Sequence, residues 1–197
     1  FVPGVSTVSG VAGYTGVGLT SNTATEIRII DGNDPDVDWS AHVSSKLTLV
    51  VLNAADKAAD ISKALIKAGR ELSTPVVVTR DGTTVDQRSV ISTLEELPAA
   101  IKVARHAGNG TVIVGDSVAK RSALSWFEAK PLFGWRVLIP RTKDSLADLV
   151  TELEQLGATV TDVPTLSVEQ PRTPQQMERA VHGLVSGRYE WIIFTSH

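Results

Sequence analysis

Three segments of the sequence combine small residues, hydroxyl-bearing residues and glycine in a way that is typical of ligand binding. The first segment, residues 2–7, reads Val-Pro-Gly-Val-Ser-Thr and leads into a stretch that we expect to be helical. Such a turn exposes backbone N–H groups and the hydroxyls of Ser6 and Thr7, which can hold a carboxylate or another polar edge of a ligand. Helix capping by Ser6 explains the same residues about as well, so both interpretations stay open.

The other two segments follow expected strands. Asn53 comes directly after the apolar run 47–52 and is followed by two alanines. Small residues at the carboxyl end of a strand leave room for ligands in α/β folds. The third segment, residues 73–84, reads Ser-Thr-Pro-Val-Val-Val-Thr-Arg-Asp-Gly-Thr-Thr, so Gly82 lies shortly after a second buried strand. Together the three segments form the candidate binding region.

A run of aspartates in the loop 31–38 is better explained as a solvated turn than as a calcium site. Asp34, Asp36 and Asp38 have the spacing of a calcium loop. Such a loop needs Gly at its sixth position and Glu at its twelfth, where this chain has Trp39 and Ser45. The four histidines show no metal-ligand spacing, so the sequence predicts no metal site.

Two further motifs do not indicate an enzyme site. The Gly-Asn-Gly sequence at 108–110 precedes an expected strand, whereas a dinucleotide fingerprint follows a strand and opens a helix, so a tight turn is favoured. Ser9 and Ser196 have neither an elbow motif nor an identifiable base nearby, which gives nucleophilic catalysis no support. Neither motif therefore indicates a catalytic site.

Composition excludes several classes of protein. The chain has 197 residues, a formal net charge of -3 and no cysteine, so we expect no disulfide, no thiolate metal site and no nucleic-acid partner. No apolar run approaches the roughly 18–20 residues that span a bilayer, and the start lacks the features of a signal peptide. We expect a soluble, cytoplasmic protein without a membrane partner. Because both ends fall inside motifs, we also expect a fragment of a longer chain.

Strands and helices alternate throughout, which is the pattern of α/β domains. The first set is a helix at 6–16, strands at 25–30 and 47–52, a helix carrying Ile61, Leu65 and Ile66 and ended by Gly69, strands at 76–78 and 88–92, a helix capped by Thr93 and Glu96 that runs to about His106, a strand at 111–114, and a helix carrying Val118, Leu124 and Phe127. After a connector at 130–134 the pattern restarts. The second set is a strand at 136–140, a helix with an apolar stripe from Leu146 to Leu156 ended by Gly157, a strand at 158–163, a helix from Thr173 to about Gly187 and a strand at 191–195.

In combination, the motifs of the first set resemble the S-adenosylmethionine-dependent tetrapyrrole methylases. The residues that carry the resemblance are Val-Pro-Gly-x-Ser at 2–6, Thr-Pro-Val at 74–76, Gly-Thr-Thr at 82–84 and Gln-Arg at 87–88. Within that family the sequence looks most like the uroporphyrinogen-III C-methyltransferases. The resemblance covers residues 1–133, which would be the second half of a methylase.

The second set is similar to the beginning of uroporphyrinogen-III synthase. The likeness lies in the strand 136–141, in 153–157, in Pro-Thr-Leu at 164–166 and in Trp-Ile-Ile-Phe-Thr-Ser at 191–196. The resemblance implies an α/β fold class in two parts. Residues 1–133 would be the C-terminal lobe of a tetrapyrrole-methylase fold, a mixed sheet with flanking helices, and residues 134–197 would start a partial flavodoxin-like synthase lobe.

By this resemblance, cofactor-binding positions can be assigned on the chain. Ser6 and Thr7 match the pair that contacts S-adenosyl-L-methionine, and Gly82 matches the loop that approaches its adenosyl portion. Asn53 falls where the family usually has Met, in a Tyr-Met-Gly context that here reads Leu-Asn-Ala, which is a departure from the family. Gly110, ahead of the last strand of the first set, is a further candidate. No metal is implied.

Three arginines allow two interpretations. Arg28, Arg80 and Arg88 could pair with the carboxylates of a tetrapyrrole substrate, because guanidinium groups bind carboxylates through paired hydrogen bonds. Structural salt bridges with nearby acidic residues would explain the same residues. The sequence favours the structural explanation.

For the methylase part, the resemblance implies methyl transfer from S-adenosyl-L-methionine to uroporphyrinogen III, a step toward precorrin-2, sirohaem and cobalamin. For the fused synthase part, it implies ring closure of linear hydroxymethylbilane. Proximity to an electron-rich pyrrole would carry most of the methylation. In the methylase family the first cofactor loop and the acid/base groups lie in the N-terminal half, outside this sequence, so we name no catalytic residue and expect the fragment alone to be inactive. The methylase part could form a homodimer. Two alternatives stay open: a methylase of another corrin intermediate or of diphthamide, and a non-catalytic ligand-binding module.

Overall fold

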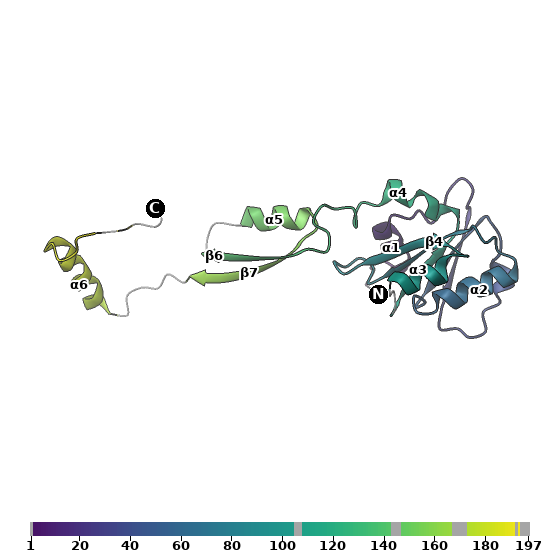
Figure 1. The fold of residues 1–197 in the computed structure, drawn as a ribbon, viewed down its shortest axis with the longest axis horizontal. Helices are drawn as coiled ribbons and strands as arrows, with labels where there is room; N and C mark the ends of the chain where they lie inside the picture. Colours follow the sequence, from purple (N-terminus) through teal and green to yellow (C-terminus); the bar gives the residue numbers. More distant parts are fainter. Residues whose placement is uncertain (1, 105–107, 143–146, 167–172, 192, 194–197) are drawn as a thin grey trace. The chain divides into compact units, whose positions relative to one another are not determined.

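Five strands form the central sheet of the first part of the chain (Figure 1). The strands are β1 (Glu26–Asp31), β2 (Leu47–Leu52), β3 (Pro75–Arg80), β4 (Arg88–Thr93) and β5 (Gly110–Val114). Their order is β1-β2-β5-β3-β4. β1 pairs parallel with β2, whereas β5 lies antiparallel between β2 and β3, and β4 is antiparallel to β3. The carboxyl ends of β1, β2 and β3 and the amino end of β5 therefore lie at one edge of the sheet.

The computed structural model describes residues 2–104, 108–142, 147–166, 173–191 and 193. By contacts the chain divides into two units. The first comprises Phe1–Val137 and Asp148–Thr161, and the second comprises Leu138–Ala147 and Asp162–His197. None of the helices in the described ranges is both long enough and apolar enough to cross a membrane.

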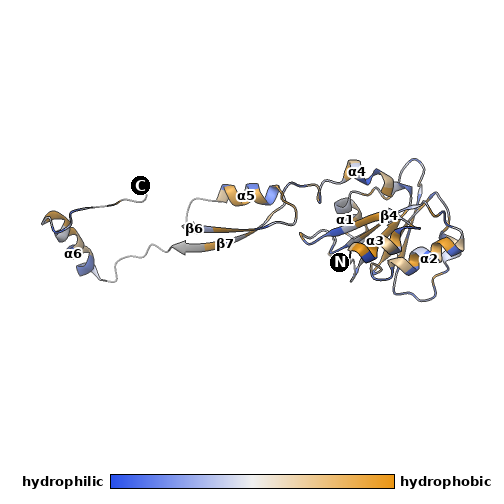
Figure 2. Ribbon diagram, in the orientation of Figure 1, coloured by the Kyte–Doolittle hydropathy of each residue, from blue (hydrophilic) through white to orange (hydrophobic). Residues whose placement is uncertain are grey.

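Side chains alternate between the two faces of the central sheet, as the period of a strand requires. Leu49 and Val51 of β2 belong to one buried cluster, and Val50 between them belongs to the other. The same alternation holds for Val76, Val77 and Val78 in β3. Figure 2 shows that these strands are mostly apolar, in keeping with a sheet that is covered on both faces.

Helices of different composition cover the two faces. The face of Leu49 is packed by α2 (Ala58–Ala68) and by α3 (Leu97–Ala104), and together they form the larger apolar cluster. The face of Val50 is packed by α1 (Thr7–Thr15), a short helix of small residues. Below, these are called the α2 face and the α1 face.

Local sequence explains where these helices begin and end. Ser6 is the N-cap of α1, since its side chain accepts a hydrogen bond from the Ser9 N–H. Gly16 and Gly69 close α1 and α2 in the left-handed conformation, as glycine after a helix commonly does. Except for the last helix, the expected strands and helices of the first set are present close to their predicted positions.

The segment after β5 differs from the prediction of one helix. It forms a 3₁₀ helix at Asp116–Lys120 and a four-residue helix, α4 (Arg121–Leu124), and Phe127 lies beyond both. The prediction placed Phe127 on the helix because apolar spacing alone cannot show the turn that follows Leu124. A 3₁₀ helix at Trp39–His42 was likewise not predicted. At the start of α3, the Glu96 N–H donates to Thr93 Oγ1 over 3.4 Å, and His106 lies outside the described residues.

The remaining elements are β6 (Arg136–Thr142), α5 (Ala147–Gln155), β7 (Thr159–Leu166) and α6 (Pro174–Val185), and β6 pairs with β7 in a two-stranded sheet. Pro174 opens α6 behind the N-cap Thr173, as expected from the sequence. The predicted strand at 191–195 is wrong for Trp191 and Ile193, which are not in a strand, and its other positions lie outside the described residues.

Candidate functional site

A cavity of about 330 Å³ opens at the edge of the central sheet where β2 and β3 end and β5 begins. Helix α1 contributes two lining residues, and the others come from the ends of β2 and β3, from the loops that follow them and from the start of β5. The walls mix apolar, hydroxyl and amide groups; the lining residues are Thr7, Val11, Leu52, Asn53, Thr79, Asp81, Gly82, Asn109, Gly110 and Thr111. A volume of this order is at the lower end of small-molecule sites, which run from roughly 300 to 1,000 Å³.

The fold brings together most of the residues that the sequence singled out. Thr7, Asn53, Gly82 and Gly110 all line this one cavity, although they come from four separate parts of the chain. Ser6 is not among the lining residues, and its Oγ is engaged in capping α1 through the Ser9 N–H, 3.2 Å away. The roles of these residues in cofactor binding stay predictions.

The backbone is strained at the same edge. Among the described residues, the non-glycine positions with positive φ are Asn53 at 54°, Asp81 at 49° and Thr83 at 73°. Asn53 and Asp81 line the cavity, and Thr83 follows Gly82 in the loop 81–86, which we call the Gly82 loop. Such conformations persist only where the surrounding structure holds them, and they cluster at binding sites.

Asn53 is held by a neighbouring loop. Its Nδ2 donates to Asp31 Oδ1 over 3.1 Å, and the Asn33 N–H donates to the same oxygen. The Asn33 N–H and then the Asn53 amide hold the pKa of the Asp31 carboxyl below its ordinary value, because both hydrogen bonds favour the ionised form. Lys57 Nζ donates to Gly32 O and Asn33 Oδ1 and so ties α2 to the same loop.

Glycine is required at two cavity positions by close packing. A Cβ atom at Gly82 would lie 2.8 Å from Cγ2 of Val11, which is on α1. A Cβ atom at Gly110 would overlap the carbonyl oxygen of Thr79 and lie 2.9 Å from Cβ of Ala55. A side chain at either position would therefore displace a wall of the cavity.

The three arginines discussed above lie in different surroundings. Arg28 Nη1 donates to the carbonyl oxygen of Ala41 over 2.6 Å, away from the cavity lining. Arg80 and Arg88 line a second cavity, of about 600 Å³, together with Arg136.

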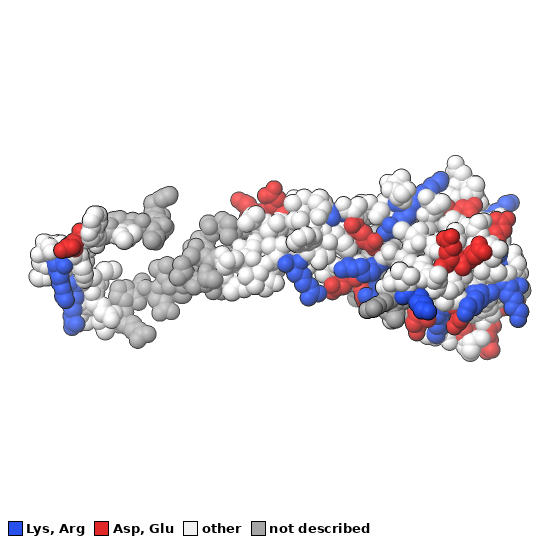
Figure 3. All heavy atoms as spheres, viewed as in Figure 1, with Lys and Arg blue, Asp and Glu red and all other residues white. Residues whose placement is uncertain are grey.

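Within this second cavity the guanidinium groups contact groups of the chain itself. Arg80 pairs with Asp81 at 3.1 Å, and Arg136 pairs with Asp86 at 3.2 Å. Arg88 donates to the carbonyl oxygen of Gln87 and lies 5.7 Å from the ring centroid of Phe133. These contacts favour the structural explanation of Arg80 and Arg88. Figure 3 shows positive and negative side chains interspersed over the visible face of this unit.

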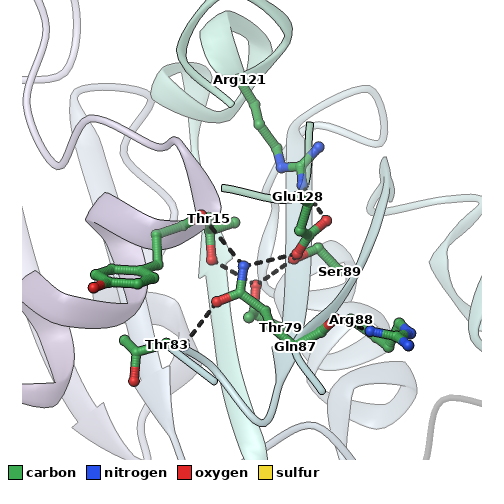
Figure 4. Close-up of polar contacts among 9 residues, drawn as sticks. Thr15, Thr79, Thr83, Gln87, Arg88, Ser89, Arg121 and Glu128 are labelled. Carbon is green, nitrogen blue, oxygen red and sulfur yellow. Dashed lines mark hydrogen bonds and ion pairs between the residues drawn. The ribbon is translucent and has the colours of Figure 1, made fainter. Parts of the chain in front are cut away.

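A largely buried polar network supports the Gly82 loop (Figure 4). At its centre Gln87, which is fully buried, accepts the Thr83 N–H at 2.7 Å through Oε1. Its Nε2 donates to Glu128 Oε1 at 2.7 Å, and Glu128 Oε2 pairs with Arg121 at 2.6 Å. Ser89 Oγ donates to the same Glu128 Oε1.

The network continues to α1. The Gln87 amide also donates to the carbonyl oxygen of Tyr14 over 3.3 Å. Thr79 Oγ1 lies 2.9 Å from Thr15 Oγ1 and 3.1 Å from Ser89 Oγ. Three elements that form the cavity, namely α1, β3 and the Gly82 loop, are thereby joined by hydrogen bonds that are buried or partly buried.

The sequence did not predict a role for this network. Gln87 belongs to the Gln-Arg motif that the sequence shares with the tetrapyrrole methylases, and this motif was the signal that could have drawn attention to it. Glu128 lies in a turn with no recognisable pattern. Its partners come from separate segments of the chain, so only the folded structure brings them together. No group of His, Cys, Asp and Glu that could hold a metal ion occurs among the residues that the structure describes.

Comparison with known proteins identifies both parts of the chain. Residues 1–98 match the family model of the tetrapyrrole (corrin/porphyrin) methylases, and residues 147–197 match that of uroporphyrinogen-III synthase. The chain is 37% identical to a siroheme synthase of Azotobacter vinelandii over 134 residues, which cover 66% of this chain and 29% of that protein. It is 29% identical to a uroporphyrinogen-III C-methyltransferase of Bacillus subtilis over 204 residues, which cover 99% of this chain and 41% of that protein.

A solved structure supports the fold. A cobalt precorrin-4 methyltransferase superposes with a TM-score of 0.54 at 22% identity, over 59% of this chain and 52% of that one. The chain thus has the mixed α/β fold of tetrapyrrole methylases, with the cavity at the edge of its sheet. Residues 1–98 belong to the tetrapyrrole methylase family, and residues 147–197 belong to the uroporphyrinogen-III synthase family. The chain spans 29% and 41% of the length of the two relatives named above.

Proposed function

We propose that this chain is part of a bifunctional enzyme that methylates uroporphyrinogen III with S-adenosyl-L-methionine and carries a uroporphyrinogen-III synthase alongside. The observation that carries the proposal is the cavity in which Thr7, Asn53 and Gly82 meet, within a segment that belongs to the methylase family. The matched relatives include proteins named for siroheme synthesis and for uroporphyrinogen-III methylation.

The chemistry of the cavity fits the cofactor. S-adenosyl-L-methionine would supply an electrophilic methyl group, and it carries a sulfonium, an amino acid portion, a ribose and an apolar adenine. Thr7 offers a hydroxyl near the start of α1, while Val11 and Leu52 offer apolar surface. Gly82 and Gly110 have no side chain, so the backbone at these positions can approach a ligand closely.

We propose that these residues bind and orient rather than take part in bond making. Their contribution would be proximity, which can lower a bimolecular barrier by about 7–11 kcal/mol when the reacting atoms are well aligned. The strained backbone at Asn53, Asp81 and Thr83 favours this role, because a preformed wall needs little reorganisation when a ligand binds.

The test uses the complete natural protein. We expect transfer of radiolabelled methyl groups from S-adenosylmethionine to uroporphyrinogen III. Gly82→Leu should abolish most of the transfer, because its side chain would push into Val11 and the cavity. Gly13→Ala is the control, since a Cβ at Gly13 has nothing within 4 Å. Absence of transfer by the unaltered protein would contradict the proposal, and binding of S-adenosylhomocysteine without transfer would indicate a ligand-binding module instead.

For the second part of the chain we propose the synthase reaction, ring closure of hydroxymethylbilane, on the strength of the family match at 147–197. We also propose a domain boundary between residues 133 and 134, a homodimer through the methylase part and a cytoplasmic location. Separate calorimetric transitions assigned to 1–133 and 134–197 would support the boundary. A single transition with uniform hydrogen exchange across Pro131 would contradict it.

A further inference from the structure

The Gly82 loop needs an external support for its shape. It contains two non-glycine residues with positive φ, Asp81 and Thr83, on either side of Gly82. Left-handed conformations cost free energy for residues other than glycine, so an unsupported loop would relax to other shapes. Within the loop, the Thr84 N–H and hydroxyl both donate to the carbonyl oxygen of Asp81. These local bonds close a turn but leave the Thr83 N–H, at the strained position, for another acceptor.

Gln87 provides that acceptor from a buried position. Its Oε1 accepts the Thr83 N–H at 2.7 Å, and the residue is fully buried. An amide can rotate by half a turn and exchange its oxygen for its nitrogen, and the flipped amide would present a donor to the Thr83 N–H. The orientation of Gln87 therefore decides whether the loop is held or released.

Glu128, together with the carbonyl oxygen of Tyr14, fixes that orientation. A carboxylate only accepts hydrogen bonds, so Glu128 Oε1, 2.7 Å from Gln87 Nε2, requires the nitrogen of Gln87 on its side and the oxygen toward Thr83. The ion pair with Arg121 at 2.6 Å, between side chains exposed by only 12% and 18%, holds the Glu128 carboxylate in place. The chain of contacts thus runs from Arg121 through Glu128 and Gln87 to the strained backbone beside Gly82.

We propose that Gln87 and Glu128 are positioning residues that set the shape of the Gly82 loop and thereby the affinity for the cofactor. They act through the backbone of Thr83 and do not line the cavity. This inference rests on the proposed function, because it takes the ligand of the cavity to be S-adenosylmethionine. Glu128 lies 30 residues beyond the end of the methylase family match at residue 98, so the family match alone does not include it.

The decisive variant is Gln87→Glu in the complete protein. It keeps an acceptor for Thr83 but places a second carboxylate against Glu128. Two carboxylates in contact cannot both stay ionised without a large cost, and one takes up a proton as the pH falls. We expect calorimetric titration with S-adenosylhomocysteine to show an affinity loss of about tenfold or more near pH 8, which shrinks as the pH is lowered toward about 6. The KM for S-adenosylmethionine should rise more than kcat falls.

Two further variants separate positioning from general stability. The exchange Gln87→Glu with Glu128→Gln restores an amide–carboxylate pair in the opposite order, so it should recover part of the affinity that Gln87→Glu alone loses at high pH. Recovery is incomplete because the exchange removes the donor to the Tyr14 carbonyl oxygen and the ion pair with Arg121. Thr48→Val is the matched control, because it removes a buried hydroxyl contact with Ser117 near the opposite end of β2. It should leave the affinity within about twofold of the unaltered protein.

A measurement without ligand separates this inference from the proposed function. The amide proton of Thr83 should exchange with solvent faster in Gln87→Glu than in the unaltered protein or in Thr48→Val, because repulsion between the carboxylates at 87 and 128 moves the acceptor away from the Thr83 N–H. If the unaltered protein does not bind S-adenosylhomocysteine, the proposed function fails and Thr83 exchange still tests the support of the loop. Unchanged Thr83 exchange in Gln87→Glu, or an affinity loss that is equal in Thr48→Val and independent of pH, would overturn the inference.

Discussion

The two faces of the central sheet differ in the polarity of the side chains that are packed on them. The α2 face is apolar almost throughout, with Leu49, Val51, Leu65, Val76 and Val78 buried together. The α1 face has a smaller apolar cluster, and its remainder is a network of hydroxyl, amide and charged side chains. Apolar packing tolerates small shifts, whereas a buried polar network has one satisfied arrangement. The α2 face therefore stabilises the fold, and the α1 face sets the geometry of the cavity.

The largest effect should come from the α2 face. Leu65 is fully buried on α2, and Leu65→Ala leaves a cavity among residues that cannot collapse fully. We expect a loss of about 2–5 kcal/mol in the free energy of unfolding. Urea denaturation measures this change. The affinity of the folded fraction for S-adenosylhomocysteine should stay unchanged, and a loss of affinity beyond the loss of folded protein would show that the two faces are not separate in function.

The second prediction concerns the wall of the cavity. Gly110→Ala would place a Cβ against the carbonyl oxygen of Thr79, so β5 and β3 must separate locally. We expect a destabilisation of about 1–3 kcal/mol together with a clear loss of cofactor affinity. The control is Gly13→Ala, where a Cβ meets nothing within 4 Å and which does not line the cavity. Equal affinities for the two variants would remove Gly110 from the site.

Much of this architecture could be predicted from the sequence because it depends on local pattern. The apolar runs of β2 and β3, the small-residue helix after Ser6 and the terminating Gly69 all have signals within a few residues. The position of β5 between β2 and β3 had no such signal, since sheet order depends on contacts between distant segments. The sequence placed Gly110 only as a further candidate, and the sheet order is what brings it beside Gly82.

The polar network could not be predicted for a related reason. Glu128 accepts hydrogen bonds from Arg121, Gln87 and Ser89, which are separated from it in the sequence by 7, 41 and 39 residues. A buried glutamine and a glutamate in a turn look, in the sequence, like ordinary surface residues. The same holds for Asn53, whose departure from the family was visible but whose bond to Asp31 was not.

A third, smaller effect is expected at Asn53. Asn53→Met would restore the residue usual in the family but would lose the bond to Asp31 and place a long side chain at φ 54°. We expect a destabilisation of about 1 kcal/mol. Asn53→Gly loses the same bond but relieves the backbone, so it should be less destabilised than Asn53→Met in the same urea denaturation. The reverse order would show that the backbone at this position is not strained.

The smallest effect concerns pH. The pKa of Asp31 in the folded protein lies below its ordinary value of 3.8, so the ionised carboxylate is favoured by folding. Its contribution to stability is therefore present above about pH 3.8 and is lost as the pH falls through the folded-state pKa. Because Asp31 is exposed, the effect is small. Acid unfolding of Asp31→Asn should show a slightly weaker pH dependence in this range, and an identical profile would show that the bonds from Asn33 and Asn53 do not favour the charge.

The most direct test of the central claim is the location of cofactor binding on the complete protein. Backbone amide shifts and hydrogen exchange, measured by NMR with and without S-adenosylhomocysteine, report on each residue separately. The account predicts that the changes concentrate at Thr7, Asn53, Gly82 and Gly110, which line the cavity, while Leu65 on the α2 face stays unaffected. Changes that spare these four residues while the ligand binds elsewhere would contradict the assignment of this cavity as the methylase cofactor site.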